Sequence, residues 1–234
     1  MMNKRSGLFF TFEGIDGCGK TTQADLLEAW LVRFCGRDSV VRTREPGGWS
    51  GGQQVRDTLL HGNLQHPWSE LYLFMYDRCE HIAQVILPNL NEGRIVLCER
   101  YHASTMAYQG WGRGMPAAFL RQLGTEAAIP VPDAILFLDV SIQTALARLV
   151  GRSCSDRFEG EGGLFLDRVR EGFLELSQTD NPSSWCRLNA DASIEGIHKE
   201  IVQQLTPLMR GDEREDFTDG LELNGGGRAS LRSK

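Results

Sequence analysis

Eight consecutive residues near the N-terminus, Gly14 to Thr21 (GIDGCGKT), have the types and the spacing of a phosphate-binding loop. Glycines let backbone N–H groups curve around a phosphate, and a helix that begins directly afterwards points its positive end at the same anion. Lys20 can reach the β- and γ-phosphates of a nucleoside triphosphate, and the Thr21 hydroxyl can bind Mg²⁺. A glycine turn before a helix is the simpler interpretation, but the lysine, the threonine and the flanking pattern together favour nucleotide binding.

Two further pairs of residues could do chemistry. Phe74 and Arg78 are four residues apart on a predicted helix, so a ring and a guanidinium on one face could stack on a base and hydrogen-bond its edge. Glu99 and Arg100 follow an apolar run, where a carboxylate could bind Mg²⁺ through water and an arginine could hold a phosphate. The alternatives are a core aromatic with a surface arginine, and a surface ion pair.

Alternating strand-like and helix-like segments must position these residues. Short apolar or β-branched runs predict buried strands at residues 8–12, 40–43, 95–98, 135–138 and 185–188. Amphipathic segments predict helices near residues 26–34, 68–92, 116–128, 141–150, 164–178 and 193–209. We expect Pro88 to kink or end the second helix. The alternation predicts a three-layer α/β fold, with a five-stranded parallel sheet between two layers of helices.

Two segments depart from this pattern. Residues 151–163 (GRSCSDRFEGEGG) are polar and glycine-rich, which predicts a mobile loop. Residues 210–234 lack a core pattern, so we expect a disordered tail. Residues 1–209 are then expected to form a single domain.

The composition excludes several classes of protein. The net charge of −6 argues against bulk attraction to nucleic acid or to an anionic membrane. Glu13 ends the first apolar run too early for a secretory signal, and no run is long enough to span a bilayer. The six cysteines are scattered without a CxxC pair, so we expect reduced thiols, no metal site built from them and a cytoplasmic location.

Four stretches, EGIDGCGKTTQ, TREPGG, ERYHASTMAYQG and FLDV, occur in the order seen in bacterial thymidylate kinases. The chain resembles this family over about residues 7–208. The phosphate loop is common to many families, whereas TREPGG together with RYxxSTxAYQG is much more specific. The resemblance implies a phosphate-loop fold, usually a homodimer, that transfers the γ-phosphoryl group of ATP to dTMP with Mg²⁺, giving ADP and dTDP.

The resemblance also implies roles for single residues. Phe74 resembles the ring that stacks on thymine, and Arg78, Thr105 and Gln109 resemble its hydrogen-bonding partners. Tyr108 would crowd the sugar, Asp16 would meet the 3′-hydroxyl, and Arg100 would hold the acceptor phosphate. The wall of the acceptor site is assigned to Glu45 and Arg56, and Arg44 is treated as an ion-pair partner. The nucleotide phosphates are assigned to Gly14, Asp16, Gly17, Cys18, Gly19, Lys20, Thr21 and Thr22, and the metal to Thr21 and Glu99.

Some family members carry a catalytic arginine in the phosphate loop, at the position that is Gly17 here. Another subgroup supplies arginines from a lid, and the segment 151–163 resembles that lid. We therefore assign catalysis to Lys20, to Arg100 and to three arginines that flank or lie within this segment: Arg148, Arg152 and Arg157. Among these three, Arg152 is the first choice. Two positions depart from the family pattern, because Glu99 replaces an aspartate and Phe173 replaces a common tyrosine.

Three other functions are weighed against this one. A kinase for another nucleotide or for a deoxynucleoside could use the same sheet and loop, since a fold does not fix a substrate. A sensor that binds ATP without turnover would need neither lid arginines nor a base pocket. A GTPase is disfavoured, because the chain has no N/T-K-x-D motif for reading guanine.

Overall fold

The computed structural model describes residues 7–150 and 162–209. Five parallel strands form one sheet with the order β2-β3-β1-β4-β5. Their bounds are β1 Phe9–Glu13, β2 Val40–Arg44, β3 Ile95–Glu99, β4 Ala134–Asp139 and β5 Trp185–Asn189. All five predicted strands are confirmed as strands, with ends shifted by at most one residue, but the edge strands β2 and β5 are only partly buried, because each has a neighbouring strand on one side only. The expected loop 151–163 lies outside the described residues except for its last two, and the expected tail 210–234 lies wholly outside them.

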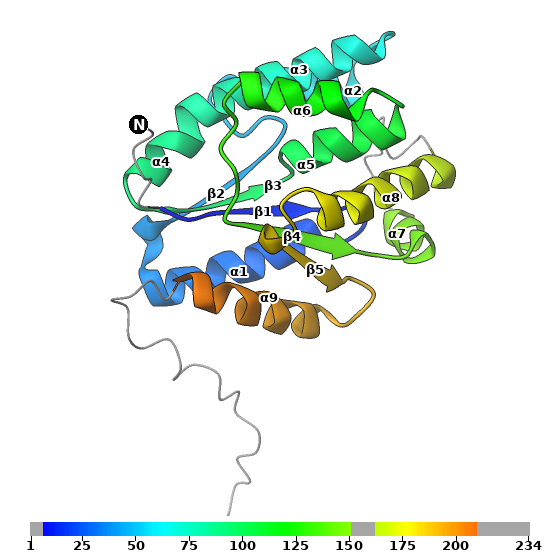
Figure 1. The fold of residues 1–234 in the computed structure, drawn as a ribbon. Helices are drawn as coiled ribbons and strands as arrows, with labels where there is room; N and C mark the ends of the chain where they lie inside the picture. The colour runs from blue at the N-terminus through cyan, green and yellow to red at the C-terminus, as the bar shows by residue number, and fades with distance from the viewer. Residues whose placement is uncertain (1–6, 151–161, 210–234) are drawn as a thin grey trace, which may run out of the picture.

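The helices cover both faces of this sheet, as predicted. Helices α1 and α9 lie on one face, and α3, α4, α6 and α8 lie on the other (Figure 1). The α-helices are α1 Lys20–Cys35, α2 Gly52–His61, α3 Pro67–His81, α4 Leu87–Asn91, α5 His102–Thr105, α6 Ala117–Glu126, α7 Ile142–Leu149, α8 Gly163–Thr179 and α9 Ile194–Met209. Because helices cover both faces, every residue of the interior strands β1 and β4 is buried.

The helical segment near residues 68–92 does not end at Pro88. Helix α3 passes through a π-helical turn, η2 Ile82–Ile86, and continues as α4, with Pro88 in the first turn of α4. Proline has no N–H to donate and tolerates the first helical turn, so the change of hydrogen-bond register just before it lets the helical segment continue.

Two helical segments were not predicted from the sequence: α2, and α5 together with the segment that follows it. Helix α2 is short and polar, and its buried residues are Gly52, Val55 and Leu59. Helix α5 leads directly into a second π-helical segment, η3 Met106–Gly112, whose residues are largely buried. Segment η3 packs against α8 so closely that a Cβ on Gly172 would lie 2.8 Å from the Trp111 ring. Tertiary packing thus holds η3 helical despite its glycines and tyrosine.

The remaining connections include two 3₁₀ turns, η1 Arg37–Ser39 and η5 Pro182–Ser184. In the described part of the chain, no helix is both long enough and apolar enough to cross a bilayer. The carboxyl ends of β1, β2 and β3 are followed by the phosphate-loop motif, the TREPGG motif and the ERYHAST motif. Because carboxyl ends of parallel strands meet at one edge of a sheet, all three motifs converge there.

Candidate active site

The phosphate loop connects β1 to α1, as its sequence predicted. Gly14, Gly17 and Gly19 all have positive φ values, of 135°, 82° and 97°. No side chain caps the N-terminus of α1, so its backbone N–H groups can serve a bound anion. The Lys20 ammonium donates to the Gly14 and Ile15 carbonyl oxygens at 3.0 and 2.9 Å, which holds it over the loop.

Position 17 cannot hold the arginine that some relatives place there. Besides its positive φ, a Cβ added to Gly17 would lie 2.6 Å from the Ala145 carbonyl oxygen. That oxygen is backbone and cannot move aside as a flexible side chain would. The loop of this chain therefore has glycine for a steric reason, and position 17 cannot contribute a charged side chain to the site.

Glu99 lies at the end of β3 and faces Thr21. The Thr21 hydroxyl donates to Glu99 Oε2 at 2.7 Å, and the Arg42 Nη2 donates to Glu99 Oε1 at 2.6 Å. The additional methylene of glutamate therefore does not keep its carboxylate away from the phosphate loop. Within the described residues no three His, Cys, Asp or Glu side chains form a metal-binding group, so a cation here would depend on Thr21, Glu99 and nucleotide oxygens.

Arg100 is the centre of a second cluster, next to the loop. Its backbone is in the left-handed region with φ 63°, which is uncommon for a non-glycine residue and typical of functional sites. The guanidinium donates to the Asp16 carboxylate and, at 3.2 Å, to the Tyr108 hydroxyl, which itself donates to Asp16 at 2.8 Å. Burial alone would raise the pKa of Asp16, but Arg100 and Lys20 outweigh burial and lower that pKa below its usual value.

Glu13, the last residue of β1, contacts the residues that follow Arg100. It is fully buried and accepts from the Tyr101 backbone N–H at 2.8 Å and from the Ser104 hydroxyl. Desolvation raises the pKa of Glu13. Since Tyr101 follows Arg100 directly, these bonds fix the strained turn that presents the Arg100 side chain.

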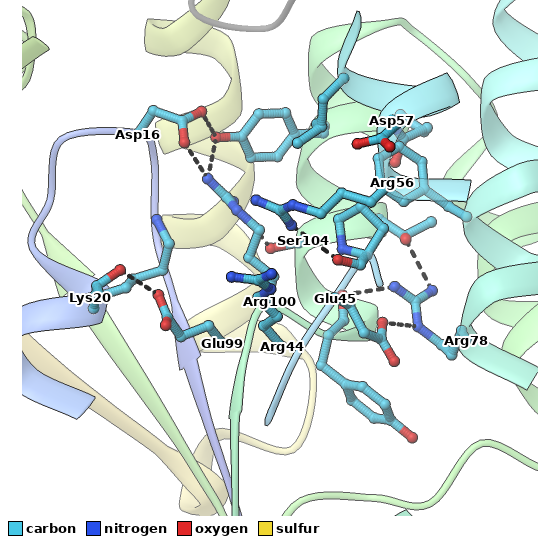
Figure 2. A pocket seen from close by; sticks show the side chains of 18 of the residues that line it. Asp16, Lys20, Arg44, Glu45, Arg56, Asp57, Arg78, Glu99, Arg100 and Ser104 are labelled. Atoms are coloured by element: carbon cyan, nitrogen blue, oxygen red, sulfur yellow. Dashed lines mark hydrogen bonds and ion pairs between the residues drawn. The ribbon is translucent and has the colours of Figure 1, made fainter. Parts of the chain in front are cut away.

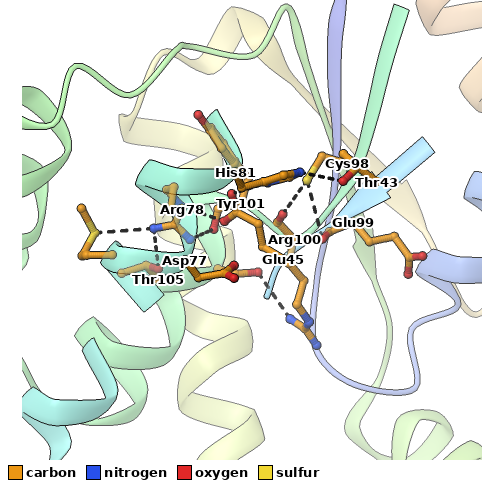
Figure 3. Close-up of polar contacts among 12 residues, drawn as sticks. Thr43, Glu45, Asp77, Arg78, His81, Cys98, Glu99, Arg100, Tyr101 and Thr105 are labelled. Atoms are coloured by element: carbon orange, nitrogen blue, oxygen red, sulfur yellow. Dashed lines mark hydrogen bonds and ion pairs between the residues drawn. The ribbon is translucent and has the colours of Figure 1, made fainter. Parts of the chain in front are cut away.

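Arg78 on α3 belongs to a buried network (Figure 3). Its side chain is only 2% exposed. Nε donates to Glu45 Oε2 at 2.8 Å, Nη1 to the Thr105 hydroxyl at 2.9 Å, and Nη2 to the Tyr101 carbonyl oxygen at 3.0 Å. Burial tends to lower the pKa of Arg78, but the Glu45 carboxylate together with Tyr101 and Glu13 outweighs burial and raises that pKa. Arg78 is therefore a fixed donor rather than a mobile arm.

Glu45 anchors this network from the TREPGG segment. Its second carboxylate oxygen lies 3.0 Å from His81 Nδ1, and His81 Nε2 lies 2.6 Å from the Thr43 hydroxyl. His81 is fully buried. Glu45 thus connects β2 to α3, and it fixes the guanidinium of Arg78 at the same time.

One cavity of about 410 Å³ joins these groups. Figure 2 shows Asp16, Glu99 and Arg100 on the side of the phosphate loop, and Arg56, Glu45 and Arg78 across from them. All nine residues assigned to the acceptor nucleotide line it: Asp16, Glu45, Arg56, Phe74, Arg78, Arg100, Thr105, Tyr108 and Gln109. So do most of those assigned to the nucleotide phosphates and the metal: Asp16, Gly17, Gly19, Lys20, Thr21, Thr22 and Glu99. The roles of these residues stay predictions, but the structure brings them together.

Other predicted residues lie elsewhere. Gly14 and Cys18 are buried within the loop and do not line the cavity. Arg148, near the end of α7, donates to the Gly17 and Ala190 carbonyl oxygens at 3.3 and 3.0 Å, outside the cavity lining. Arg152 and Arg157 lie outside the described residues. Phe173 is fully buried and stacks on Phe137, with 5.4 Å between the ring centroids.

Sequence reasoning missed several cavity residues. Arg44 was expected to be an ion-pair partner, but among the residues described it forms no ion pair, and it lines the cavity. Helix α2 adds Gln53, Asp57 and His61 beside the predicted Arg56. Their spacing of four residues places them on one helical face, and that period is the signal that could have revealed them.

Comparisons with known proteins agree with this geometry. The family model described as thymidylate kinase matches residues 12–201. The chain is 40% identical over 207 residues to the thymidylate kinase of Synechococcus sp. (strain CC9605), covering 86% of this chain and 97% of that protein. It is 41% identical over 207 residues to that of Prochlorococcus marinus (strain MIT 9303), covering 86% and 94%.

A solved structure of a thymidylate kinase has a similar fold. The crystal structure of thymidylate kinase from Ehrlichia chaffeensis superimposes with a TM-score of 0.73 at 34% sequence identity, covering 85% of this chain and 98% of that chain. The sheet order, the phosphate loop and the cavity beside it are thus accompanied by similarity along most of the sequence, and this chain belongs to the thymidylate kinase family.

Proposed function

We propose that this protein transfers the γ-phosphoryl group of ATP to the 5′-phosphate of dTMP, giving ADP and dTDP. Membership of the thymidylate kinase family makes the chain an enzyme that uses ATP. The single observation that carries the detailed proposal is the continuous cavity, which is lined at one end by Lys20 and Thr21 and at the other by Phe74, Arg78 and Gln109. An in-line transfer needs donor and acceptor in one such space.

The donor end suits a nucleoside triphosphate with Mg²⁺. The loop N–H groups and the N-terminus of α1 favour the phosphates, and Lys20 adds a positive charge. The Thr21 hydroxyl and the Glu99 carboxylate are hard oxygen ligands of the kind Mg²⁺ prefers, and they are already in contact with each other. When bound, Mg²⁺ would neutralise charge on the phosphate oxygens.

The acceptor end suits a deoxynucleoside monophosphate. Arg100, held over the loop by Asp16 and Tyr108, is placed to donate to a 5′-phosphate, which would compete with Asp16 for its N–H groups. Asp16 could then accept from the sugar 3′-hydroxyl, and the Tyr108 ring would crowd a 2′-hydroxyl. Arg56 donates to the Pro46 carbonyl oxygen at 2.8 Å, which supports its role in the wall.

The base would lie against Phe74, with its edge toward Arg78, Thr105 and Gln109. Thr105 accepts from Arg78, so its own O–H is left to donate. Thymine offers carbonyl acceptors and one N3–H donor, which complement two donors and one amide oxygen.

Charge over the migrating group is assigned to the lid, with Arg152 first. One observation supports the choice of the lid over the loop, and a second supports Arg152 over Arg148. Gly17 cannot be replaced by an arginine without a clash, and Arg148 is engaged with backbone carbonyls beside the loop. Positive charge from these arginines would stabilise the negative charge of the group in transfer.

We also propose that residues 1–209 act as one kinase domain in a cytoplasmic homodimer. Tyr72 and Tyr76, one turn apart on α3, are 57% and 50% exposed, which suits burial against a second copy. Light scattering after size exclusion would test the dimer; a monomer at micromolar concentration would contradict it.

A coupled ADP-release assay with ATP, Mg²⁺ and a panel of monophosphates tests the function. We expect kcat/KM to be highest for dTMP and lower for dUMP, because a missing methyl in an apolar pocket costs about 1–3 kcal/mol. The rate for dCMP should be near background, and purines should fail on size. Lys20→Ala protein from the same preparation is the control for contaminating kinases. Equal efficiency with dCMP or dGMP would exclude a thymidylate-specific enzyme.

A further inference from the structure

Gln109, which lines the cavity from η3, is held by a buried ion pair behind it. Its Nε2 donates to Glu70 Oε1 at 2.9 Å. Arg113 donates to the same carboxylate through Nε at 3.3 Å and through Nη2 at 3.2 Å. Glu70 and Gln109 are each only 1% exposed, although both side chains are polar.

This contact decides which way the amide points. A carboxylate in an ion pair only accepts hydrogen bonds, so the group that meets Glu70 must be the Gln109 NH₂. A rotation of the amide by half a turn would set its carbonyl oxygen against the carboxylate and leave a buried pair of acceptors without a proton between them. The amide atom on the other side of the same planar group is Oε1, an acceptor.

We propose that Glu70, supported by Arg113, is a positioning residue that fixes Gln109 as a hydrogen-bond acceptor and thereby limits the substrate to pyrimidines with an N3–H group. This inference rests on the proposed function, because it concerns the base that the cavity receives. Glu70 itself does not touch the base; it acts through the orientation of the amide.

The opposite edge of the pocket has the complementary chemistry. Three of the five Arg78 N–H groups donate to Glu45, Thr105 and Tyr101, so a further Arg78 N–H and the Thr105 O–H are donors that would match the O4 acceptor of thymine. Cytosine reverses both groups, since it has an amino donor at position 4 and an acceptor at N3. A freely turning amide could adapt to the cytosine N3, but an amide fixed by Glu70 cannot. Glu70 therefore disfavours cytosine, whose N3 acceptor would face the Gln109 acceptor, in addition to favouring the N3–H of thymine.

The test compares dTMP with 5-methyl-dCMP, which differ only at positions 3 and 4 of the base. In Glu70→Gln an amide faces Gln109, and two amides can pair in either orientation. We expect the ratio of kcat/KM for 5-methyl-dCMP to that for dTMP to rise about ten-fold, mostly through KM, with incomplete relaxation because Arg78 still opposes the amino group. Glu70→Asp keeps the charge near Arg113 but shortens the side chain, and it should raise the ratio in the same direction.

Asp139→Asn is the matched control, because it also converts a buried carboxylate of an ion pair, here with Arg170 and Arg187, into an amide. It should lower the thermal midpoint without changing the ratio. An unchanged ratio in both folded Glu70 variants would overturn the proposal while the dTMP kinase stands. A wild-type enzyme that does not phosphorylate dTMP would instead refute the proposed function.

Discussion

Replacing Arg78 by lysine tests whether this position needs only a positive charge or also the planar arrangement of guanidinium donors. The substitution keeps a positive charge near Glu45, but it replaces three donor nitrogens in a fixed plane by one ammonium. In the structure these nitrogens meet Glu45, Thr105 and the Tyr101 carbonyl oxygen at 2.8, 2.9 and 3.0 Å. The ammonium can satisfy Glu45, but it cannot span the other two acceptors as well.

The cost follows from burial. An acceptor buried without its donor costs about 1–3 kcal/mol, and two acceptors are affected. We therefore expect the free energy of unfolding to fall by about 2–6 kcal/mol, and Tm to fall by roughly 5–20 °C for a chain of this size. We also expect KM for dTMP to rise more than kcat falls, because the proposed function assigns Arg78 to the base of the acceptor.

Urea unfolding and thermal melts without nucleotide, followed by initial rates with varied dTMP, would measure both effects. Arg37→Lys is the control: Arg37 pairs with Glu28 at 3.2 Å on the surface and is 76% exposed, so this variant should behave as wild type. An Arg78→Lys protein whose Tm lies within about 1 °C of wild type, with unchanged KM, would refute the view of Arg78 as a buried, three-way donor.

Three further predictions concern the loop, the lid and pH. Lys20→Ala should reduce kcat/KM by on the order of 10²–10³ in steady-state assays while the circular dichroism spectrum is unchanged; a near-normal rate would remove the loop lysine from the mechanism. Arg152→Ala should lower kcat, by up to about 10³-fold, more than it weakens binding. Adding Gly17→Arg to the Arg152→Ala protein should not restore activity, because position 17 has no room for a side chain. Recovery of activity in this double variant would contradict the steric argument. Burial, together with Arg78 and Arg121, lowers the pKa of His102 to about 3. Because the unfolded chain binds this proton below about pH 6.5, folding stability should fall with decreasing pH by up to about 1.4 kcal/mol per unit, and His102→Gln should show a smaller loss in urea midpoint between pH 6.5 and 4.5. Parallel pH curves for the two proteins would show that His102 titrates normally.

Local patterns were sufficient for most of the fold. The phosphate loop is contiguous in the sequence, so its glycines, Lys20 and Thr21 specify a strand, an anion-binding turn and a helix within about twenty residues. The short apolar runs of β1, β3 and β4 also predict buried strands, because a strand covered on both faces needs apolar residues at successive positions. The resemblance to a family then assigned the acceptor residues, and the cavity brings all nine of them together.

Local patterns failed where packing overrides propensity. Helix α2 has only two apolar side chains among its buried residues, Val55 and Leu59, which is a weak helical pattern, and η3 contains glycines that disfavour a helix in isolation. Both segments are stabilised by what they pack against, and this includes the close contact of Gly172 with Trp111. No window of sequence contains that information.

The sequence by itself determined the strand, the glycine-rich turn and the helix of a phosphate-loop motif at the first strand, since every residue needed for them follows in order along the chain. Only the tertiary structure decided how the hydrogen-bonding groups that line the cavity are oriented. Arg78 meets Glu45 from 33 residues away, and Gln109 meets Glu70 from 39 residues away. Hydrogen-bond direction depends on which donor faces which acceptor across a buried contact, and this is fixed only when distant segments pack together.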